Sequence, residues 1–575
     1  MGFWGLPAAE WTMNDPPTKA QAAASPGTDR TPPRVDLSMA DLAAILEHAR
    51  TALSDAEFAT LQGAMQTLAF LTRELEKKSV SIQRLRQLLF GAGTETTAKV
   101  IQAVRQAVGT GSRSAMPADV KSKGHGRNGA QAYVGAQRVQ VALEHLRAGD
   151  ACPTCGKGTV YTGGEPGRIV RLTGQAPISG TVYELEKLRC NLCGQVFTAE
   201  APAGVGAEKY DAESAAMIGL LKYGTGVPFH RLETLQQGLG LPLPASTQWE
   251  IVAQTAGVLM PAWRELIQRA AQGQILHNDD TTMKVLGLGS EKQEANASAS
   301  ADAEETAAPA DPAAGRKGIF TSGIVSKVGE QTVALFFTGH KHAGENLFDL
   351  LQRRSSDLAP PIQMCDALSR NLPAELKTLL AHCLAHGRRK FVDVAGNFPE
   401  ECLHVLEILK VVYANDAIAR EQRMSDQERL RFHQAESGPA MAELKAWLDA
   451  QIEQKQVEPN SGLGEAITYL RKHWEPLTLF LRVAGAPLDN NICERALKLT
   501  ILHRKNAYFY KTENGARVGD LFMSLIHTCR LNGVNPFHYL TQLQKHSREL
   551  AAAPADWMPW NYQATLEAGQ GRPSG

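Results

Sequence analysis

The sequence lacks an excess of either charge, because its 575 residues carry 60 Lys and Arg against 60 Asp and Glu. Proteins that bind nucleic acid often have a basic excess, so this balance argues against DNA binding unless basic residues are concentrated locally. The chain also lacks any run of eighteen apolar residues, which predicts no membrane span. Residues Met1–Leu6 lack a basic start followed by an apolar run, so we expect no export signal.

Cysteine is scarce, with nine residues, and four of the nine form two Cys-x-x-Cys pairs. The pairs are Cys152 with Cys155, and Cys190 with Cys193, and each pair is followed by glycine. This usage favours metal binding in a reducing cytosol over a disulfide framework. Four thiolates make a closed tetrahedral site, which predicts structural Zn²⁺ in a zinc ribbon. The alternative is four unrelated reduced cysteines.

The length predicts several domains, and 43% hydrophobic residues are enough to fill their cores. Changes in composition predict a disordered N-terminus (1–36), a helical coiled coil (37–95), a basic linker (96–147), a zinc-binding domain (148–200) and a helical segment (205–271). Further along, they predict an α/β domain (272–510) with a disordered loop (289–316) and a helical insertion (395–482), then a C-terminal helical element (511–550) and a tail (551–575).

The coiled coil is predicted from apolar residues that recur every seven positions. They are Leu61, Leu68, Leu75, Ile82 and Leu89. Such a seam suits self-association into a homo-oligomer. A helical hairpin that packs within its own domain is the alternative.

Two N-terminal segments carry weaker signals for DNA binding. Residues 101–147 hold seven basic and two acidic side chains, a net charge of +5, which suits either contact with phosphates or a soluble linker. Residues 211–271 read as three short helices, the third opened by Thr247 and Glu250 at the spacing of a capping box. These helices fit a helix-turn-helix-like DNA reader or a plain helical connector equally well.

The α/β domain is predicted from apolar strands at 274–286, 318–325, 331–337 and 361–366, with helices at 344–353 and from about 373. Asp279 lies in the first of these strands, and Asp366 ends the fourth. Acids at the ends of these two strands would lie side by side if the strands are neighbours. The region therefore predicts a mixed α/β core with two carboxylates at one edge.

A third acid, Glu494, lies in a predicted helix that begins after Asp489 and is rich in basic residues. Those bases are Arg495, Lys498, Arg504 and Lys505. One interpretation is a solvated helix in which Glu494 pairs with Lys498. The other is a metal-holding acid that faces a polyanion.

Residues 381–391 are predicted to form a basic helix whose Arg388, Arg389 and Lys390 face DNA. Cys383 and His386, with His382 in the same stretch, invite a metal assignment. We favour the DNA-facing interpretation, because no fourth ligand lies nearby in the sequence and the three bases would repel a cation.

Together, Asp279, Asp366 and Glu494 can hold two divalent ions about 4 Å apart, the arrangement used in phosphodiester chemistry. Mg²⁺ suits three carboxylates because it prefers oxygen ligands and keeps water positions open for substrate phosphates, and Mn²⁺ is the alternative ion.

Several separate stretches resemble the insertion sequence 66 family of bacterial DDE transposases. They are 83–91, the two Cys-x-x-Cys pairs, 222–231, 276–281, 383–391, 488–498 and 531–536. The motif at 276–281 identifies Asp279 rather than Asp280 as the first acid, and the motif at 488–498 places Glu494 as the third.

The resemblance implies an RNase H-like catalytic core with an α-helical insertion, and Mg²⁺ held by Asp279, Asp366 and Glu494. It implies cleavage at terminal inverted repeats, joining of the 3′ ends to target DNA, and action at the nucleoid in the bacterial cytoplasm. Small accessory proteins of the same element are possible partners, and the basic side chains near the acids would bind phosphates. The alternatives are a non-catalytic, domesticated DNA-binding protein and a metal-dependent nuclease that does not join strands.

Overall fold

The computed structural model describes residues 208–288, 316–373 and 377–570 without a break. Before residue 208 it describes 39–50, 53–54, 56–62, 101 and discontinuous parts of 130–206. The chain divides into two compact units, residues 1–93 and 94–575. In the first unit, helix α1 spans Met39–Ala49. The predicted heptad positions after Leu61 lie outside the described residues, so the coiled coil stays a prediction.

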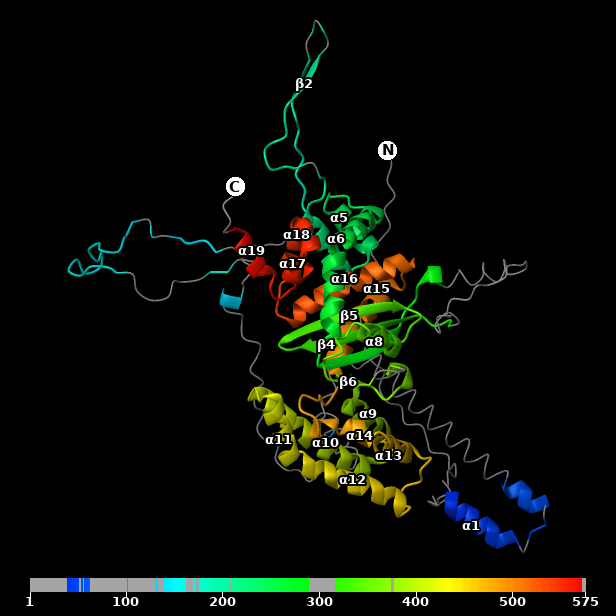
Figure 1. Cartoon of the computed structure of the whole chain (residues 1–575). Coiled ribbons are helices and arrows are strands. Elements are labelled where there is room, and N and C mark those ends of the chain that lie inside the picture. Colours follow the sequence, from blue (N-terminus) through cyan, green and yellow to red (C-terminus); the bar gives the residue numbers. More distant parts are fainter. Residues whose placement is uncertain are drawn as a thin grey trace, which may run out of the picture. The chain divides into compact units, whose positions relative to one another are not determined.

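The second unit contains a five-stranded mixed sheet in the order β5-β4-β3-β6-β7, of which Figure 1 labels β4, β5 and β6. The strands are β3 (Ile275–Thr282), β4 (Phe320–Val328), β5 (Gln331–Gly339), β6 (Ile362–Cys365) and β7 (Leu379–His382). Strands β3, β4 and β5 form an antiparallel meander, whereas β6 and β7 run parallel to β3. The first acid-bearing strand, β3, is therefore the central one, and β6, which precedes the second acid, is its neighbour.

Strand β7 is absent from the sequence-based prediction, which was wrong here. A helix was expected from about residue 373 and a second one over 381–391, but Leu379–His382 pairs with β6 and helix α9 begins only at Leu384. The strand is four residues long, and its backbone bonds come from β6. A strand that depends on a distant partner leaves little local periodicity in the sequence.

The helices before and within the sheet region were largely anticipated. They are α4 (Ala212–Gly219), α5 (Phe229–Gly238), α6 (Ala245–Ala271) and α8 (Ala343–Leu351). Helix α6 starts after Pro244 with no side-chain cap, so the expected capping box of Thr247 and Glu250 is wrong. Both residues lie inside the helix.

After strand β7 the chain is helical up to the third acid, and the predicted insertion at 395–482 lies within this stretch. It contains α9 (Leu384–Val394), α10 (Pro399–Glu421), α11 (Asp426–Glu436), α12 (Gly438–Glu453), α13 (Gly462–Lys472) and α14 (Trp474–Leu477). The chain then returns to the sheet and ends in α15 (Asn491–Ala507), α16 (Glu513–Leu531), α17 (Pro536–Lys545), α18 (Ser547–Ala552) and α19 (Tyr562–Gln570). Within the described residues, no helix is both long and apolar enough to cross a bilayer.

Two hydrophobic cores are present. One lies between the β3–β5 meander and helices α4–α6 and α15–α19, and includes Leu276, Phe336 and Phe522. The other lies among β6, β7 and the inserted helices, and includes Met364 and Phe391. The start of α15 is tied to both, because Cys493 packs in the first core and Leu488 in the second.

Helix α16 covers β5, the edge strand of the sheet, because side chains along the helix are spaced like the outward N–H groups along the strand. The outward N–H groups of β5 recur every two residues, about 6.6 Å apart, and side chains four apart on a helix are about 6 Å apart. Four polar side chains, three on α16 and one on its C-cap residue Asn532, therefore accept one β5 N–H group each. The pairs are Thr338 with Asp520 (2.7 Å), Phe336 with Ser524 (3.1 Å), Ala334 with Thr528 (3.0 Å) and Thr332 with Asn532 (3.2 Å). This ladder of side chains satisfies an edge that would otherwise be open to pairing with another chain.

Asp520 in this ladder gives a prediction for the pH dependence of stability. Burial raises the pKa of Asp520 to about 7, although hydrogen bonds from Thr338 oppose the shift. A folded-state pKa above the unfolded value means that stability is lost as the pH rises through about 7. We expect Asp520→Asn to match wild type near pH 5 and to be about 1–3 kcal/mol more stable at pH 8, because Asn still accepts the Thr338 N–H without a charge.

Urea denaturation at pH 5 and pH 8 measures this difference. The control, Asp520→Ala, leaves the Thr338 N–H without its acceptor and should lose about 1–3 kcal/mol at both pH values. An Asp520→Asn variant that is less stable than wild type at both pH values would contradict the prediction.

Candidate active site

Asp279 lies on the central strand and faces helix α15. It pairs with Gly323 across the antiparallel ladder. A Cβ atom at Gly323 would come within 3.0 Å of the Leu497 side chain and 3.5 Å of the Cys493 Sγ. The missing side chain therefore lets α15 approach the sheet beside Asp279, and Glu494 follows Cys493 on that helix.

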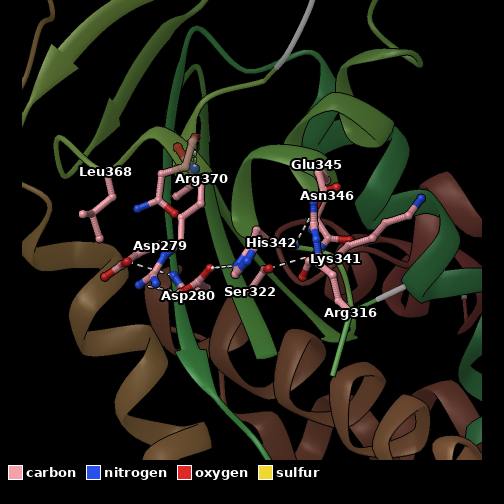
Figure 2. Close-up of polar contacts among 12 residues, drawn as sticks. Asp279, Asp280, Arg316, Ser322, Lys341, His342, Glu345, Asn346, Leu368 and Arg370 are labelled. Atoms are coloured by element: carbon pink, nitrogen blue, oxygen red, sulfur yellow. Dashed lines mark hydrogen bonds and ion pairs between the residues drawn. The ribbon is translucent and has the colours of Figure 1, made fainter. Parts of the chain in front are cut away.

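Asp280 points to the opposite face of the sheet, because successive side chains of a strand alternate. Its carboxylate, whose side chain is 1% exposed, contacts His342 Nδ1 at 2.8 Å and an Arg370 guanidinium nitrogen at 3.2 Å. Figure 2 shows these contacts leading from Asp280 toward His342, with Asp279 adjacent on the strand. Asp280 is thus engaged in structural contacts, whereas Asp279 remains available to the other two acids.

Asp366 follows strand β6 and is held by a short turn. Its Oδ1 accepts the Leu368 N–H at 3.2 Å and a bond from the Asn371 side-chain amide. The Asn371 carbonyl in turn accepts from Asn278 Nδ2 at 2.7 Å and Gln363 Nε2 at 2.8 Å. Since Asn278, Gln363 and Asn371 are fully buried, the turn that carries the second acid is fixed to the central strand.

Glu494 lies in the first turn of α15, whose start is bonded to the sheet. The Asn490 side chain makes no bond to the helix and instead contacts His277 Nδ1 at 3.1 Å and donates to the Asn278 carbonyl at 3.1 Å. Asp489 accepts the Asn491 N–H at 3.1 Å and so supplies a cap one residue earlier. These bonds fix where Glu494 stands relative to Asp279.

Asp279 feels the charges of the other two acids. Burial, and then the charge of Asp366, raises the pKa of Asp279 to about 7, with smaller contributions from Asp280 and Glu494. Carboxylates that repel one another in this way favour a divalent cation, which neutralises them together. The donor set, all oxygen, is the one that Mg²⁺ and Mn²⁺ prefer.

The predicted basic residues differ in what they present to the surface. Arg389, Lys390, Arg495, Lys498 and Lys505 are exposed. Arg388 is only 8% exposed, so it does not present a free guanidinium to DNA as predicted. The Arg504 side chain binds Thr281 Oγ1 at 3.1 Å and Thr282 Oγ1 at 2.7 Å, which ties the end of α15 to β3.

Two residues near the acids were not predicted as site residues. His386, on the first turn of α9, has Nδ1 3.9 Å from Glu494 Oε1. Tyr469, on the inserted helix α13, has a backbone hydrogen bond with Ala367, and burial and the Asp366 charge raise its pKa to about 12. A rule based on sequence spacing missed His386 because its partner Glu494 lies on the far side of the insertion, and Tyr469 carries no sequence signal.

The predicted zinc site is described only in part, because Cys190 lies outside the described residues. Strands β1 (Lys187–Arg189) and β2 (Val196–Thr198) form an antiparallel hairpin around Cys193. After Cys155, Gly156 adopts φ +64°, a left-handed turn that glycine favours. Backbone N–H groups of Lys157 and Gly158 lower the pKa of the Cys155 thiol. This turn has the features of a zinc knuckle, and the zinc site itself stays a prediction.

The order of the sheet and the placement of its acids define a class of protein. A meander of three antiparallel strands followed by two parallel ones carries one acid on the central strand, one after its parallel neighbour and one on the helix against that face. This arrangement is consistent with an RNase H-like core of the DDE class.

The chain belongs to the IS66 family of transposases, since the profile described as "Transposase IS66 family" matches residues 209–518. This match confirms the resemblance drawn from the motifs, and membership of the family implies DNA transposition. The chain is also 26% identical over 524 residues to uncharacterized protein y4hP of Sinorhizobium fredii, covering 85% of this chain and 89% of that protein. It is 28% identical over 360 residues to uncharacterized protein y4jD of the same organism, covering 61% of this chain but only 66% of that protein.

Proposed function

We propose that this protein cleaves the ends of an insertion sequence and joins the freed 3′ ends to target DNA. The proposal is supported by Asp279 on β3, Asp366 directly after the neighbouring strand β6, and Glu494 on the helix that packs against β3, with the charges of Asp366 and Glu494 contributing to the raised pKa of Asp279. Two neighbouring exposed bases, Arg495 and Lys498, follow Glu494 on α15 and suit a strand of phosphates.

In this proposal the three carboxylates hold two divalent ions. Such ions, when bound, activate the attacking oxygen and stabilise the leaving oxygen of a phosphodiester. Other residues of the chain hold these acids in place: the buried turn at Asn371 fixes Asp366, and Asn490 fixes the start of the Glu494 helix. Lys390, Arg495 and Lys498 would bind phosphates and orient the strand without reading its sequence.

The chemistry that this site would carry out balances without an external energy source. Water first attacks a phosphorus at the element end, breaking the P–O3′ bond and freeing a 3′-OH. That 3′-OH then attacks a phosphorus of the target, so one phosphodiester bond forms for each one that breaks. The zinc ribbon and the helical segment would recognise the terminal repeats, and the coil would pair two protomers on two ends.

An excision and integration assay tests the function. A plasmid carries a marker between the DNA segments that flank the gene, and the protein is supplied with Mg²⁺ or with a chelator. We expect marker DNA joined to new sites only with Mg²⁺. Nicking at the ends without joining would favour a nuclease, and binding to the ends without any cleavage would favour a non-catalytic DNA-binding protein.

The zinc proposal has its own measurement. Full-length wild type should contain about one zinc ion per chain, and Cys152→Ser should lose most of it, because three remaining ligands no longer close the tetrahedral site. Cys402→Ser, which changes a buried core cysteine, serves as the control and should keep the metal. Equal zinc content in wild type and Cys152→Ser would contradict the proposed zinc ribbon.

A further inference from the structure

His386 and Glu494 are brought together by the starts of two helices. The Leu384 N–H, at the start of α9, donates to the Leu488 carbonyl at 3.0 Å. The Asn490 N–H, just before α15, donates to Cys383 Sγ at 3.2 Å. These two bonds run in opposite directions between the segments and hold them in register, so the residues one turn into each helix face each other.

The ring of His386 is directed at Glu494 without bonding it. Nδ1 lies 3.9 Å from Glu494 Oε1, beyond hydrogen-bond range. The same nitrogen is buried and has no hydrogen-bond partner among the described residues. A buried ring nitrogen without a partner, next to a carboxylate, is free to share a third group with that carboxylate.

The separation of the two atoms fits a shared metal ion. Two ligand atoms that each lie about 2.1 Å from one ion are about 3 Å apart at a right angle and about 4.2 Å apart when opposite. Among the described residues, one group of three potential ligands has all its ligand atoms within 4.8 Å of one another, and it consists of Cys383, His386 and Glu494.

Cys383 is the least suited member of that group. Its side chain is fully buried, and its sulfur already accepts the Asn490 N–H. A thiol ligand must lose its proton, which burial in an apolar core opposes. Cys383 therefore acts as a structural link between the two helix starts, and the ligand pair is His386 with Glu494.

We propose that His386, through Nδ1, is a further ligand of the divalent ion that Glu494 holds. The inference rests on the proposed function, because it requires an ion at Glu494. A ring nitrogen added to carboxylate oxygens shifts the preference of the site from Mg²⁺ toward Mn²⁺ and later first-row metals. A ligand role also gives a reason for His386 on a helix whose basic residues would by themselves repel a cation.

The experiment uses Mn²⁺ as the probe on the full-length protein without DNA. Binding is measured by the loss of the free Mn²⁺ electron paramagnetic resonance signal, and pulsed spectra report nitrogen bound directly to the ion. Wild type should show nitrogen coupling. His386→Ala should lose the coupling and bind Mn²⁺ roughly tenfold more weakly.

Four further variants make the outcomes distinct. His48→Ala, which changes an exposed histidine of α1, should keep both the coupling and the affinity. His386→Asp should restore binding through oxygen but show no nitrogen coupling, which separates loss of a ligand from loss of the fold. Asp279→Asn and Glu494→Gln should each weaken binding.

If the acid variants weaken Mn²⁺ binding but wild type shows no nitrogen coupling, or coupling that survives in His386→Ala, the inference about His386 is overturned and the proposed function stands. If neither acid variant changes Mn²⁺ affinity, the three-acid site of the proposed function fails as well.

Discussion

Asp279→Asn is expected to slow strand cleavage by about a thousandfold or more. The same variant should nevertheless melt at a higher temperature than wild type in metal-free buffer at pH 8. The loss follows because an amide is a poor ligand for a divalent ion, and several kcal/mol of transition-state stabilisation correspond to this factor. The gain follows because Asp279 is partly buried among other carboxylates, which raises its pKa to about 7.

The sign of the stability effect depends on pH. Because the folded-state pKa of Asp279 lies above its ordinary value of 3.8, the stability associated with its proton is lost as the pH rises through about 7. At pH 8 the neutral amide should therefore stabilise the metal-free protein, by about 1 kcal/mol since the site is partly open to water. Near pH 5 the difference should vanish.

The adjacent Asp280 supplies the matched control. Asp280→Asn breaks contacts with His342 and Arg370 on the other face of the strand and leaves an arginine without its partner. We expect Asp280→Asn to lose about 2–4 kcal/mol of stability.

Part of the cleavage activity of Asp280→Asn should remain at low temperature. Calorimetry with and without Mg²⁺, and cleavage of DNA that carries the element ends, measure both effects. If Asp280→Asn abolished cleavage while Asp279→Asn kept part of it, Asp280 would be the catalytic acid.

The sequence predicted the parts of the site that depend on local pattern. Apolar strands around 274–286 and 361–366 carry their own signal, and alternation along a strand separates neighbouring acids onto two faces. Asp279 was chosen as the first acid from the family resemblance of the motif at 276–281, and the structure places Asp280 on the opposite face. Glu494 was predicted from a motif at the start of a helix, where the structure also puts it.

The parts that depend on distant partners could not be predicted. Strand β7 exists because β6 supplies its backbone bonds, and Arg388 is buried by packing that no short stretch encodes. A metal role for His386 was rejected because no fourth ligand lay near it in the sequence and because the three neighbouring bases would repel a cation. The missing ligand, Glu494, comes from beyond the helical insertion, and only the bonds between the starts of α9 and α15 bring the two together.

Gly344→Ala is expected to weaken metal binding by the three acids, because it displaces the backbone segment that positions them. Gly344 lies at the start of α8, where the helix backbone approaches the segment after the second acid. A Cβ atom there would come within 2.7 Å of the Leu372 carbonyl carbon and 2.8 Å of the Arg370 oxygen. Both are backbone atoms, so no side chain can swing away to make room.

The segment that must move is the one that positions two acids. Asn371 binds the Asp366 carboxylate, and Arg370 pairs with Asp280. We expect Gly344→Ala to lose about 1–3 kcal/mol of stability through overpacking. Mn²⁺ affinity should fall severalfold even at temperatures where the variant is fully folded, because Asp366 no longer stands where the other acids require it.

Gly257→Ala separates this effect from the ordinary consequence of replacing a helical glycine. Gly257 is exposed on α6, and a Cβ atom there would meet nothing within 4 Å. That variant should gain about 0.5–1 kcal/mol, since alanine favours the helix, and should bind Mn²⁺ as wild type does. Urea denaturation and Mn²⁺ titration compare the two variants directly. A Gly344→Ala protein with wild-type stability and affinity would mean that the segment at 370–372 yields freely, and that the second acid does not depend on the contact with α8.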